Sequence, residues 1–186
     1  LGAKLRVAKL KKVRDWFLNN DILDFGDPAE NFFRSRMLPE DFVDSKEVQG
    51  NVVKYFASFD EAIQDFNVEK LPQEDEKETS KSYRIDALHK MTDSQKMAAI
   101  PLKMESSGTL KMFALYPSLK DVLDNGGTLF IDELNARLHP LLVRNIILTF
   151  LSPEINTQNA QLIFTTHDIW QFSNELLRRD EIWLVN

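Results

Sequence analysis

Two adjacent carboxylates, Asp132 and Glu133, directly follow a short apolar run at residues 128–131. The run is partly β-branched, and its character predicts a strand buried on both faces in a parallel sheet. Ligands of open α/β folds bind outside the carboxyl ends of such strands. In a nucleotide hydrolase the first acid would hold Mg²⁺ and the second would orient the attacking water. The competing interpretation is that both acids cap the following turn and helix.

A histidine, His167, stands at the end of a second apolar run, residues 161–166, and is followed by Asp168. If the two runs form neighbouring strands, His167 lies at the same sheet edge as Glu133. A neutral imidazole in that place can hydrogen-bond a γ-phosphate and the attacking water. A lone histidine is more often structural, so the prediction depends on this pairing.

A third candidate site opens a predicted helix with four small residues, Ser106, Ser107, Gly108 and Thr109. Hydroxyls, a glycine and free backbone N–H groups at a helix N-terminus make an anion site. An ordinary N-cap uses the same residue types, so this interpretation stays open beside the first.

The elements around these residues alternate between strand and helix in the second half of the chain. A hairpin is predicted at residues 83–104 with a turn at 92–94, and helical spacing at 109–123 is interrupted near Pro117. After a turn at 125–127, the predicted order is strand, helix, strand, helix and strand, at 128–131, 140–151, 161–166, 170–179 and 181–185. This order is typical of a right-handed parallel α/β layer.

The first 82 residues carry no recognisable chemistry. Helices are predicted at residues 3–20, 31–36 and 47–66, the last piece beginning at Asp60-Glu61, and residues 69–82 form a charged exposed loop. The first helix has a basic face, which is either a solvated surface or a nucleic-acid contact. We therefore expect a mainly helical lobe or insertion at 1–82 and a separate part at 83–186.

Composition excludes several classes of protein. The chain has 186 residues, of which 43% are apolar, and no cysteine, so disulfide frameworks, thiolate zinc sites and cysteine nucleophiles are excluded. Its net charge of −6 argues against a broadly basic surface that coats nucleic acid. No uncharged apolar run reaches about 18 residues, so no membrane span is expected. The absence of cysteine fits a reducing cytoplasm.

In this order, the candidate sites resemble the C-terminal half of an ABC-type ATPase domain. More narrowly, they resemble the ATP-binding proteins of bacterial abortive-infection and related anti-phage systems, which are relatives of the SMC and OLD ATPases. The matching segments are a signature motif at 106–109, a Walker B strand at 127–133, a D-loop region at 134–140, an H-loop strand at 161–168 and the following strand at 178–183.

The resemblance implies an α/β fold, a partial P-loop NTPase core with parallel strands flanked by helices, a helical lobe and a β-hairpin. It implies ATP and Mg²⁺ as cofactors, with Asp132 at the metal, Glu133 and His167 catalytic, and Ser106, Ser107, Gly108 and Thr109 contacting ATP. Two domains would sandwich ATP in a homodimer, and hydrolysis would control a nuclease or toxin effector. Contact with nucleic acid is left open, and a cytoplasmic location is expected.

Two departures from this pattern bear on activity. Ala136 and Arg137 stand where a polar residue and a small serine are more usual, and no Gly-x-x-x-x-Gly-Lys-Ser/Thr phosphate loop occurs. Since the chain also begins without Met, we expect a fragment that is inactive alone and belongs to an active full-length ATPase. The alternatives are an inactive scaffold and a DNA-repair-like SMC-type ATPase. A Toprim nuclease is disfavoured because no Asp-x-Asp pair occurs.

Overall fold

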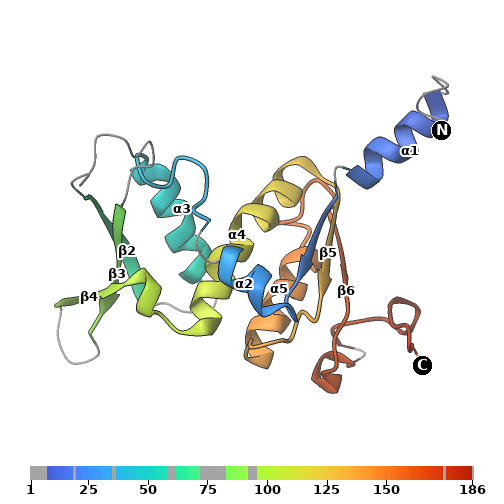
Figure 1. Ribbon diagram of the computed structural model, residues 1–186. Coiled ribbons are helices and arrows are strands. Elements are labelled where there is room, and N and C mark those ends of the chain that lie inside the picture. The colour runs from blue at the N-terminus through green and yellow to red at the C-terminus, as the bar shows by residue number, and fades with distance from the viewer. Residues whose placement is uncertain are drawn as a thin grey trace. The chain divides into compact units, whose positions relative to one another are not determined.

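The computed structural model of the chain describes residues 8–18, 20–34, 37–57, 62–71, 83–91, 96–173 and 175–185. The chain forms two compact units, each with its own three-stranded sheet (Figure 1). The first unit comprises Leu1–Asn31 with Ser118–Asn186, and the second comprises Phe32–Pro117. Their boundary falls inside helix α4, Ser107–Asn125. The predicted division into residues 1–82 and 83–186 is based on the character of the sequence rather than on compactness, and it stays a prediction.

The sheet of the first unit is parallel, which confirms the predicted α/β class. Strand β5, Thr128–Asp132, lies between β1, Asp21–Asp24, and β6, Gln161–Phe164, in the order β1-β5-β6. The prediction missed β1, because four residues give too little alternation to reveal a strand. The sheet therefore takes its third strand from the beginning of the chain.

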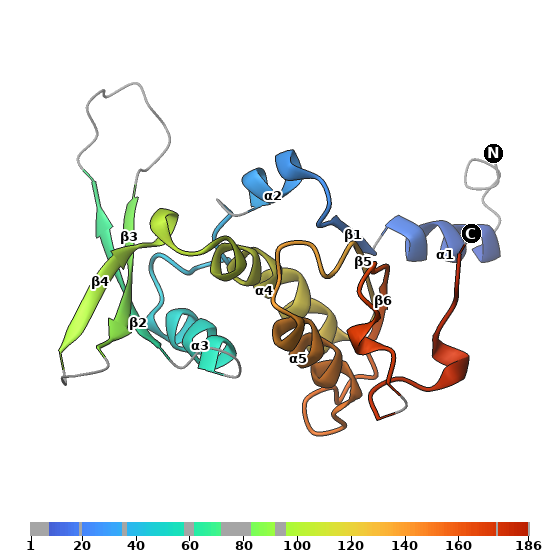
Figure 2. The same ribbon diagram turned by 90° about the horizontal axis from the view of Figure 1, so that it is seen from below.

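Only one face of this sheet is well buried. Leu23, Leu129 and Ile131 are at most 2% exposed on that face, where the second half of α4 and α5, Pro140–Leu151, lie (Figures 1 and 2). The opposite face carries a row of three register partners, Ile22, Phe130 and Ile163. Ile22 and Ile163 are exposed and Phe130 is half-buried, so the expected burial on both faces is wrong for this side.

The turn before β5 and the start of the helix after it are determined by the residues that form them. Gly126 and Gly127 have φ angles of +74° and +132°, which glycine adopts readily, and they form the predicted turn before the strand. Helix α5 has the predicted bounds, since Pro140 fits its first turn and the His139 Nδ1 atom accepts a hydrogen bond of 3.3 Å from the Leu141 N–H.

The predicted helix at 170–179 and strand at 181–185 are both wrong. Two short 3-10 helices occur instead, η2 at Ile169–Gln171 and η3 at Arg179–Glu181. Residues 182–185 have no regular structure, and Trp183 is largely exposed. A strand needs a neighbour for its backbone hydrogen bonds, and no strand of the described ranges pairs with this segment.

The second unit contains an antiparallel sheet in the order β2-β3-β4, with β2 at Ile63–Lys70, β3 at Tyr83–Lys90 and β4 at Met97–Pro101. The pairing of β3 with β4 confirms the predicted hairpin. Helix α3, Lys46–Ala57, ends earlier than predicted, and residues 63–66 are strand. An irregularity between Ile63 and Asp65 lets Ile63 and Phe66 both face the core, a spacing of three that imitates a helix.

The core of the second unit is aromatic. The Phe42 ring meets the rings of Phe66 and Phe113 edge to face, with centroid separations of 5.1 and 5.3 Å, and all three are fully buried. Helix α4 continues through Pro117, so the predicted interruption is wrong. Buried residues on both sides, Leu115 and Leu119, hold the helix where proline removes one hydrogen bond.

The remaining elements are short helices. Helix α1 spans Ala8–Leu18, α2 spans Pro28–Arg34 and the 3-10 helix η1 spans Leu102–Met104. Helix α2 begins three residues before the predicted start, because the Asp27 carboxylate accepts a hydrogen bond of 2.8 Å from the Ala29 N–H. Residues 3–7, Asp60-Glu61, most of the charged loop and the turn at 92–94 lie outside the described residues. No helix in the described ranges is long and apolar enough to cross a membrane.

Candidate active site

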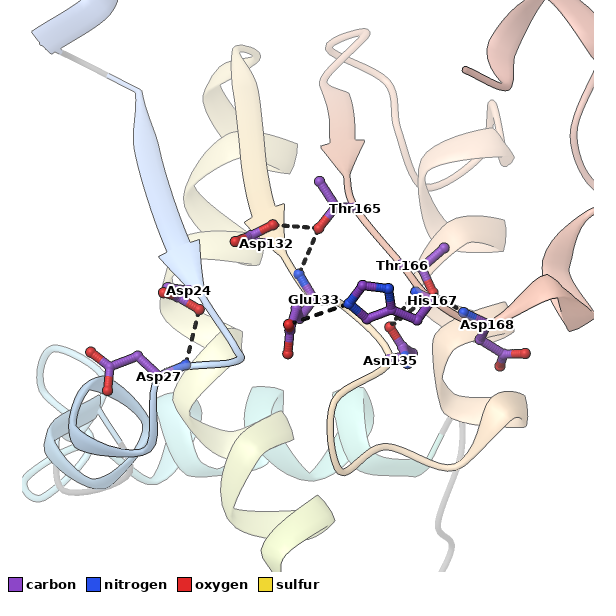
Figure 3. A network of polar contacts seen from close by, with 9 residues as sticks. All are labelled: Asp24, Asp27, Asp132, Glu133, Asn135, Thr165, Thr166, His167 and Asp168. Carbon is purple, nitrogen blue, oxygen red and sulfur yellow. Dashed lines mark hydrogen bonds and ion pairs between the residues drawn. The ribbon is translucent and has the colours of Figure 1, made fainter. Parts of the chain in front are cut away.

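The two candidate acids at the end of β5 share one partner, Thr165, which follows the end of β6 (Figure 3). The Thr165 hydroxyl donates a hydrogen bond to the Asp132 carboxylate. The same oxygen accepts a hydrogen bond of 2.9 Å from the backbone N–H of Glu133. One side chain therefore orients the Asp132 carboxylate and fixes the backbone at Glu133. The sequence alone assigns no role to Thr165.

The backbone at Glu133 is left-handed, with a φ angle of +51°. This conformation costs a non-glycine residue about 1–2 kcal/mol, and such residues cluster at functional sites. Two hydrogen bonds hold the turn, from the Ala136 N–H to the Glu133 carbonyl at 2.8 Å and from the Leu134 N–H to the Thr165 carbonyl at 3.0 Å. Leu134 is fully buried, whereas the Glu133 side chain is 40% exposed. The turn thus anchors an apolar residue and leaves the carboxylate accessible.

His167 lies beside Glu133, as the sequence predicts for neighbouring strand ends. Its Nε2 atom is 3.4 Å from the Glu133 Oε1 atom, and its side chain is 82% exposed (Figure 3). A polar contact this exposed contributes little to stability, because water competes for both groups. A role for the imidazole in the core is therefore excluded, while the catalytic roles of His167 and Glu133 stay predictions.

The loops after β5 and β6 are joined by Asn135. Its Oδ1 atom accepts hydrogen bonds from the Thr166 hydroxyl at 2.9 Å and the His167 backbone N–H at 3.3 Å. The Thr166 hydroxyl in turn accepts from the Asp168 N–H at 3.0 Å. These bonds fix the backbone that carries the imidazole. The sequence placed Asn135 in the D-loop region without a role, since no local pattern predicts a bond over this separation.

Strand β1 brings a further carboxylate to the same edge. Asp24 is the register partner of Asp132, and the Phe25 N–H donates a hydrogen bond of 2.9 Å to the Asp132 carbonyl. The Asp24 Oδ1 atom accepts a hydrogen bond of 2.9 Å from the Asp27 N–H (Figure 3). The sequence does not predict Asp24 as a site residue, because it does not predict strand β1. Carboxylates therefore stand at the ends of two adjacent parallel strands.

The oxygen atoms at this edge fit a hard cation in part. Asp132, Glu133 and Thr165 supply carboxylate and hydroxyl oxygens, which Mg²⁺ prefers. Within the ranges that the structure describes, no group of three or more His, Cys, Asp or Glu residues could hold a metal ion alone. Mg²⁺ characteristically uses one or two carboxylates together with phosphate oxygens and water. Asp132 is therefore better suited to bind Mg²⁺ together with a nucleotide than to form part of a site made of protein ligands alone.

The predicted anion site stands at the start of α4, in the second unit. The Ser106 Oγ atom accepts a hydrogen bond of 3.1 Å from the Thr109 N–H and lies 2.8 Å from the Thr109 hydroxyl. These contacts are those of an ordinary N-cap, so the capping interpretation holds for Ser106 and Thr109. Ser107 and Gly108 lie in the first helical turn, and Ser107 is exposed. Contact of all four residues with ATP stays a prediction.

A parallel sheet flanked by helices, with acids at its carboxyl edge, defines a core of the P-loop NTPase type. A family model described as "AAA domain, putative AbiEii toxin, Type IV TA system" matches residues 9–169, most of the chain. The chain belongs to this family. The matched stretch includes Asp132, Glu133 and His167. Comparison with curated proteins and with solved structures gives no match.

Family membership indicates what kind of protein this is in general terms. It points to nucleotide binding, usually with Mg²⁺, and to nucleotide hydrolase activity. The description of the family also connects the chain with abortive-infection proteins, as the sequence resemblance implies.

Proposed function

We propose that this chain is the hydrolytic part of an ABC-type ATPase, related to the SMC and OLD ATPases, that hydrolyses ATP as a dimer. The observation that carries the proposal is the Glu133–His167 contact of 3.4 Å beside Asp132, at the carboxyl edge of a parallel sheet. In its biological setting the ATPase acts in the cytoplasm in bacterial anti-phage defence and controls a nuclease or toxin effector.

The partly exposed Glu133 carboxylate carries the central step of the proposed reaction. It accepts a hydrogen bond from the attacking water and so orients the water toward the γ-phosphate. His167 Nε2, close to the same carboxylate, hydrogen-bonds the γ-phosphate or the water. When bound, Mg²⁺ would neutralise charge on the phosphate oxygens.

The surrounding residues hold these groups in place. Thr165 fixes the Asp132 carboxylate for the cation and holds the backbone of Glu133. Asn135 fixes the backbone of His167. Ser107 and Gly108 would offer their hydroxyl and N–H groups to the ATP of the partner subunit. Since the chain contains no Gly-x-x-x-x-Gly-Lys-Ser/Thr loop, the test requires the full-length protein.

The test is Glu133→Gln in the full-length protein. Glutamine keeps the shape but removes the charge that polarises water, so ATP turnover should be lost while ATP binding remains and the closed dimer accumulates. Turnover assays and size-exclusion chromatography with ATP measure both effects. Wild-type turnover in this variant would remove Glu133 from the mechanism.

A matched control is Glu154→Gln, which makes the same chemical change. Glu154 is exposed in the loop that enters β6, at the amino end of the strand and so at the opposite edge of the sheet from Glu133. Its substitution should leave turnover unchanged. If the wild-type full-length protein binds ATP but does not hydrolyse it, the alternative of an inactive scaffold is favoured instead.

A further inference from the structure

Gly26, just beyond the end of β1, lies against the Glu133 carboxylate. A Cβ atom added at Gly26 would lie 2.6 Å from the Glu133 Oε2 atom and 2.8 Å from its Cδ atom. It would also lie 3.2 Å from the Asp24 Oδ1 atom. Side chains do not approach this closely, because contacts between nonbonded carbon atoms are optimal at about 3.5–4.0 Å. The carboxylate therefore occupies the space that any other residue at position 26 would need.

The local backbone gives no other reason for this glycine. Among the described residues, only Gly126 and Gly127 are glycines with a positive φ angle. Gly26 therefore has a backbone conformation that alanine can adopt. The chain around it is tied down by the bonds from the Phe25 N–H to the Asp132 carbonyl and from the Asp27 N–H to Asp24, each 2.9 Å long.

The two oxygens of the Glu133 carboxylate have different neighbours. Oε1 lies 3.4 Å from His167 Nε2, whereas Oε2 is the atom closest to the space at Gly26. We propose that Gly26 is a positioning residue. Because it has no side chain, it keeps open the slot in which the Glu133 carboxylate lies beside His167. The inference rests on the proposed function of Glu133, and no direct contact of Gly26 with the substrate is involved.

Gly26→Ala in the full-length protein tests the inference. The added methyl group should displace the carboxylate while the fold is kept, because the end of the Glu133 side chain is flexible and partly exposed. A misplacement of about 1 Å can reduce the rate of an enzyme by about 100-fold. We expect kcat to fall at least about tenfold, with the KM for ATP and the melting temperature little changed.

Two controls separate this role from a merely structural one. Gly50→Ala is the matched control, because nothing lies within 4 Å of a Cβ at Gly50 and its turnover should be unchanged. In a Glu133→Asp background, the shorter side chain should not meet the methyl group, so Gly26→Ala should add little further loss. The inference would be overturned if Gly26→Ala reduced turnover equally in both backgrounds or left it at the wild-type rate. A large fall in the melting temperature of Gly26→Ala would also overturn it.

A crystal structure of the full-length Gly26→Ala variant gives a readout independent of activity. The Glu133 carboxylate should leave the slot between Gly26 and His167. An unmoved carboxylate would overturn the inference even if the wild-type protein hydrolyses ATP. If the wild-type protein shows no turnover, the proposed function fails, and the position of the carboxylate still decides the role of Gly26.

Discussion

The Thr165 hydroxyl accepts a hydrogen bond of 2.9 Å from the backbone N–H of Glu133. The bond joins the ends of β6 and β5 at the residue whose backbone is left-handed. Since the same hydroxyl donates to Asp132, it sets the relative orientation of both acids. A threonine without chemistry of its own thus determines the geometry in which the proposed chemistry occurs.

Replacing Thr165 with valine should impair hydrolysis more than stability. Valine keeps the shape but removes both hydrogen bonds, so ATP turnover by the full-length protein should fall about 10- to 100-fold. Because Thr165 is exposed, the free energy of unfolding should fall by only about 1 kcal/mol. Thr165→Ser retains the hydroxyl and should keep most of the activity. Valine and serine variants of equal activity would contradict this role.

Two histidines should give opposite results when each is changed to alanine. His167→Ala should slow hydrolysis strongly with little change in melting temperature, because its side chain is 82% exposed and contacts Glu133. His139→Ala removes the cap of α5 and should cost about 1 kcal/mol of stability while turnover remains. Turnover assays and thermal unfolding of both variants provide the comparison. A large loss of stability in His167→Ala would contradict the predicted difference between the two histidines.

The sequence predicts the central part of the fold because the local signals are strong there. An apolar run that ends in two acids defines β5, and Pro140 defines the start of α5. The short strand β1 and the irregular strand β2 were missed, since pairing with distant strands, rather than local periodicity, stabilises them.

The candidate site also has a part that the sequence predicts and a part that it does not. The meeting of Glu133 with His167 is predictable, because parallel strands in one sheet end at one edge. The roles of Thr165 and Asn135 depend on hydrogen bonds between residues that are at least 31 positions apart in the sequence. The role of Gly26 depends on its closeness to Glu133, which is also distant in the sequence. Such contacts depend on the register of the strands, which no local pattern in the sequence contains.

Gly126→Ala should destabilise the first unit without a direct effect on the site. The φ angle of +74° disfavours alanine, and the added Cβ would lie 3.0 Å from the Gln158 carbonyl oxygen. We expect a loss of about 1–2 kcal/mol in the free energy of unfolding, measured by denaturant titration. Gly50→Ala, in helix α3 with open space, should instead be neutral or stabilising. A loss of the same size at both positions would contradict the argument from backbone strain.

We propose that Ser107 and Gly108 act on the ATP held by the partner subunit. In the ABC arrangement that the sequence resembles, a head-to-tail partner brings the N-terminus of the signature helix to a γ-phosphate. An acid at Gly108 would block this approach and repel phosphate, so Gly108→Asp should abolish hydrolysis without abolishing ATP binding.

Mixing two inactive full-length variants, Gly108→Asp and Glu133→Gln, tests this arrangement. In a mixed dimer, one composite site has its own Glu133 and the partner's Gly108, while the other site has neither. If the sites act independently, each mixed dimer should recover up to about half of the wild-type activity. A mixture of Glu133→Gln with His167→Ala is the matched control. Both of these residues act within their own subunit, so each site of that mixed dimer carries one defect and mixing should recover no activity. Recovery in the control, or none in the test mixture although mixed dimers form, would contradict independent sites that use the partner's Gly108.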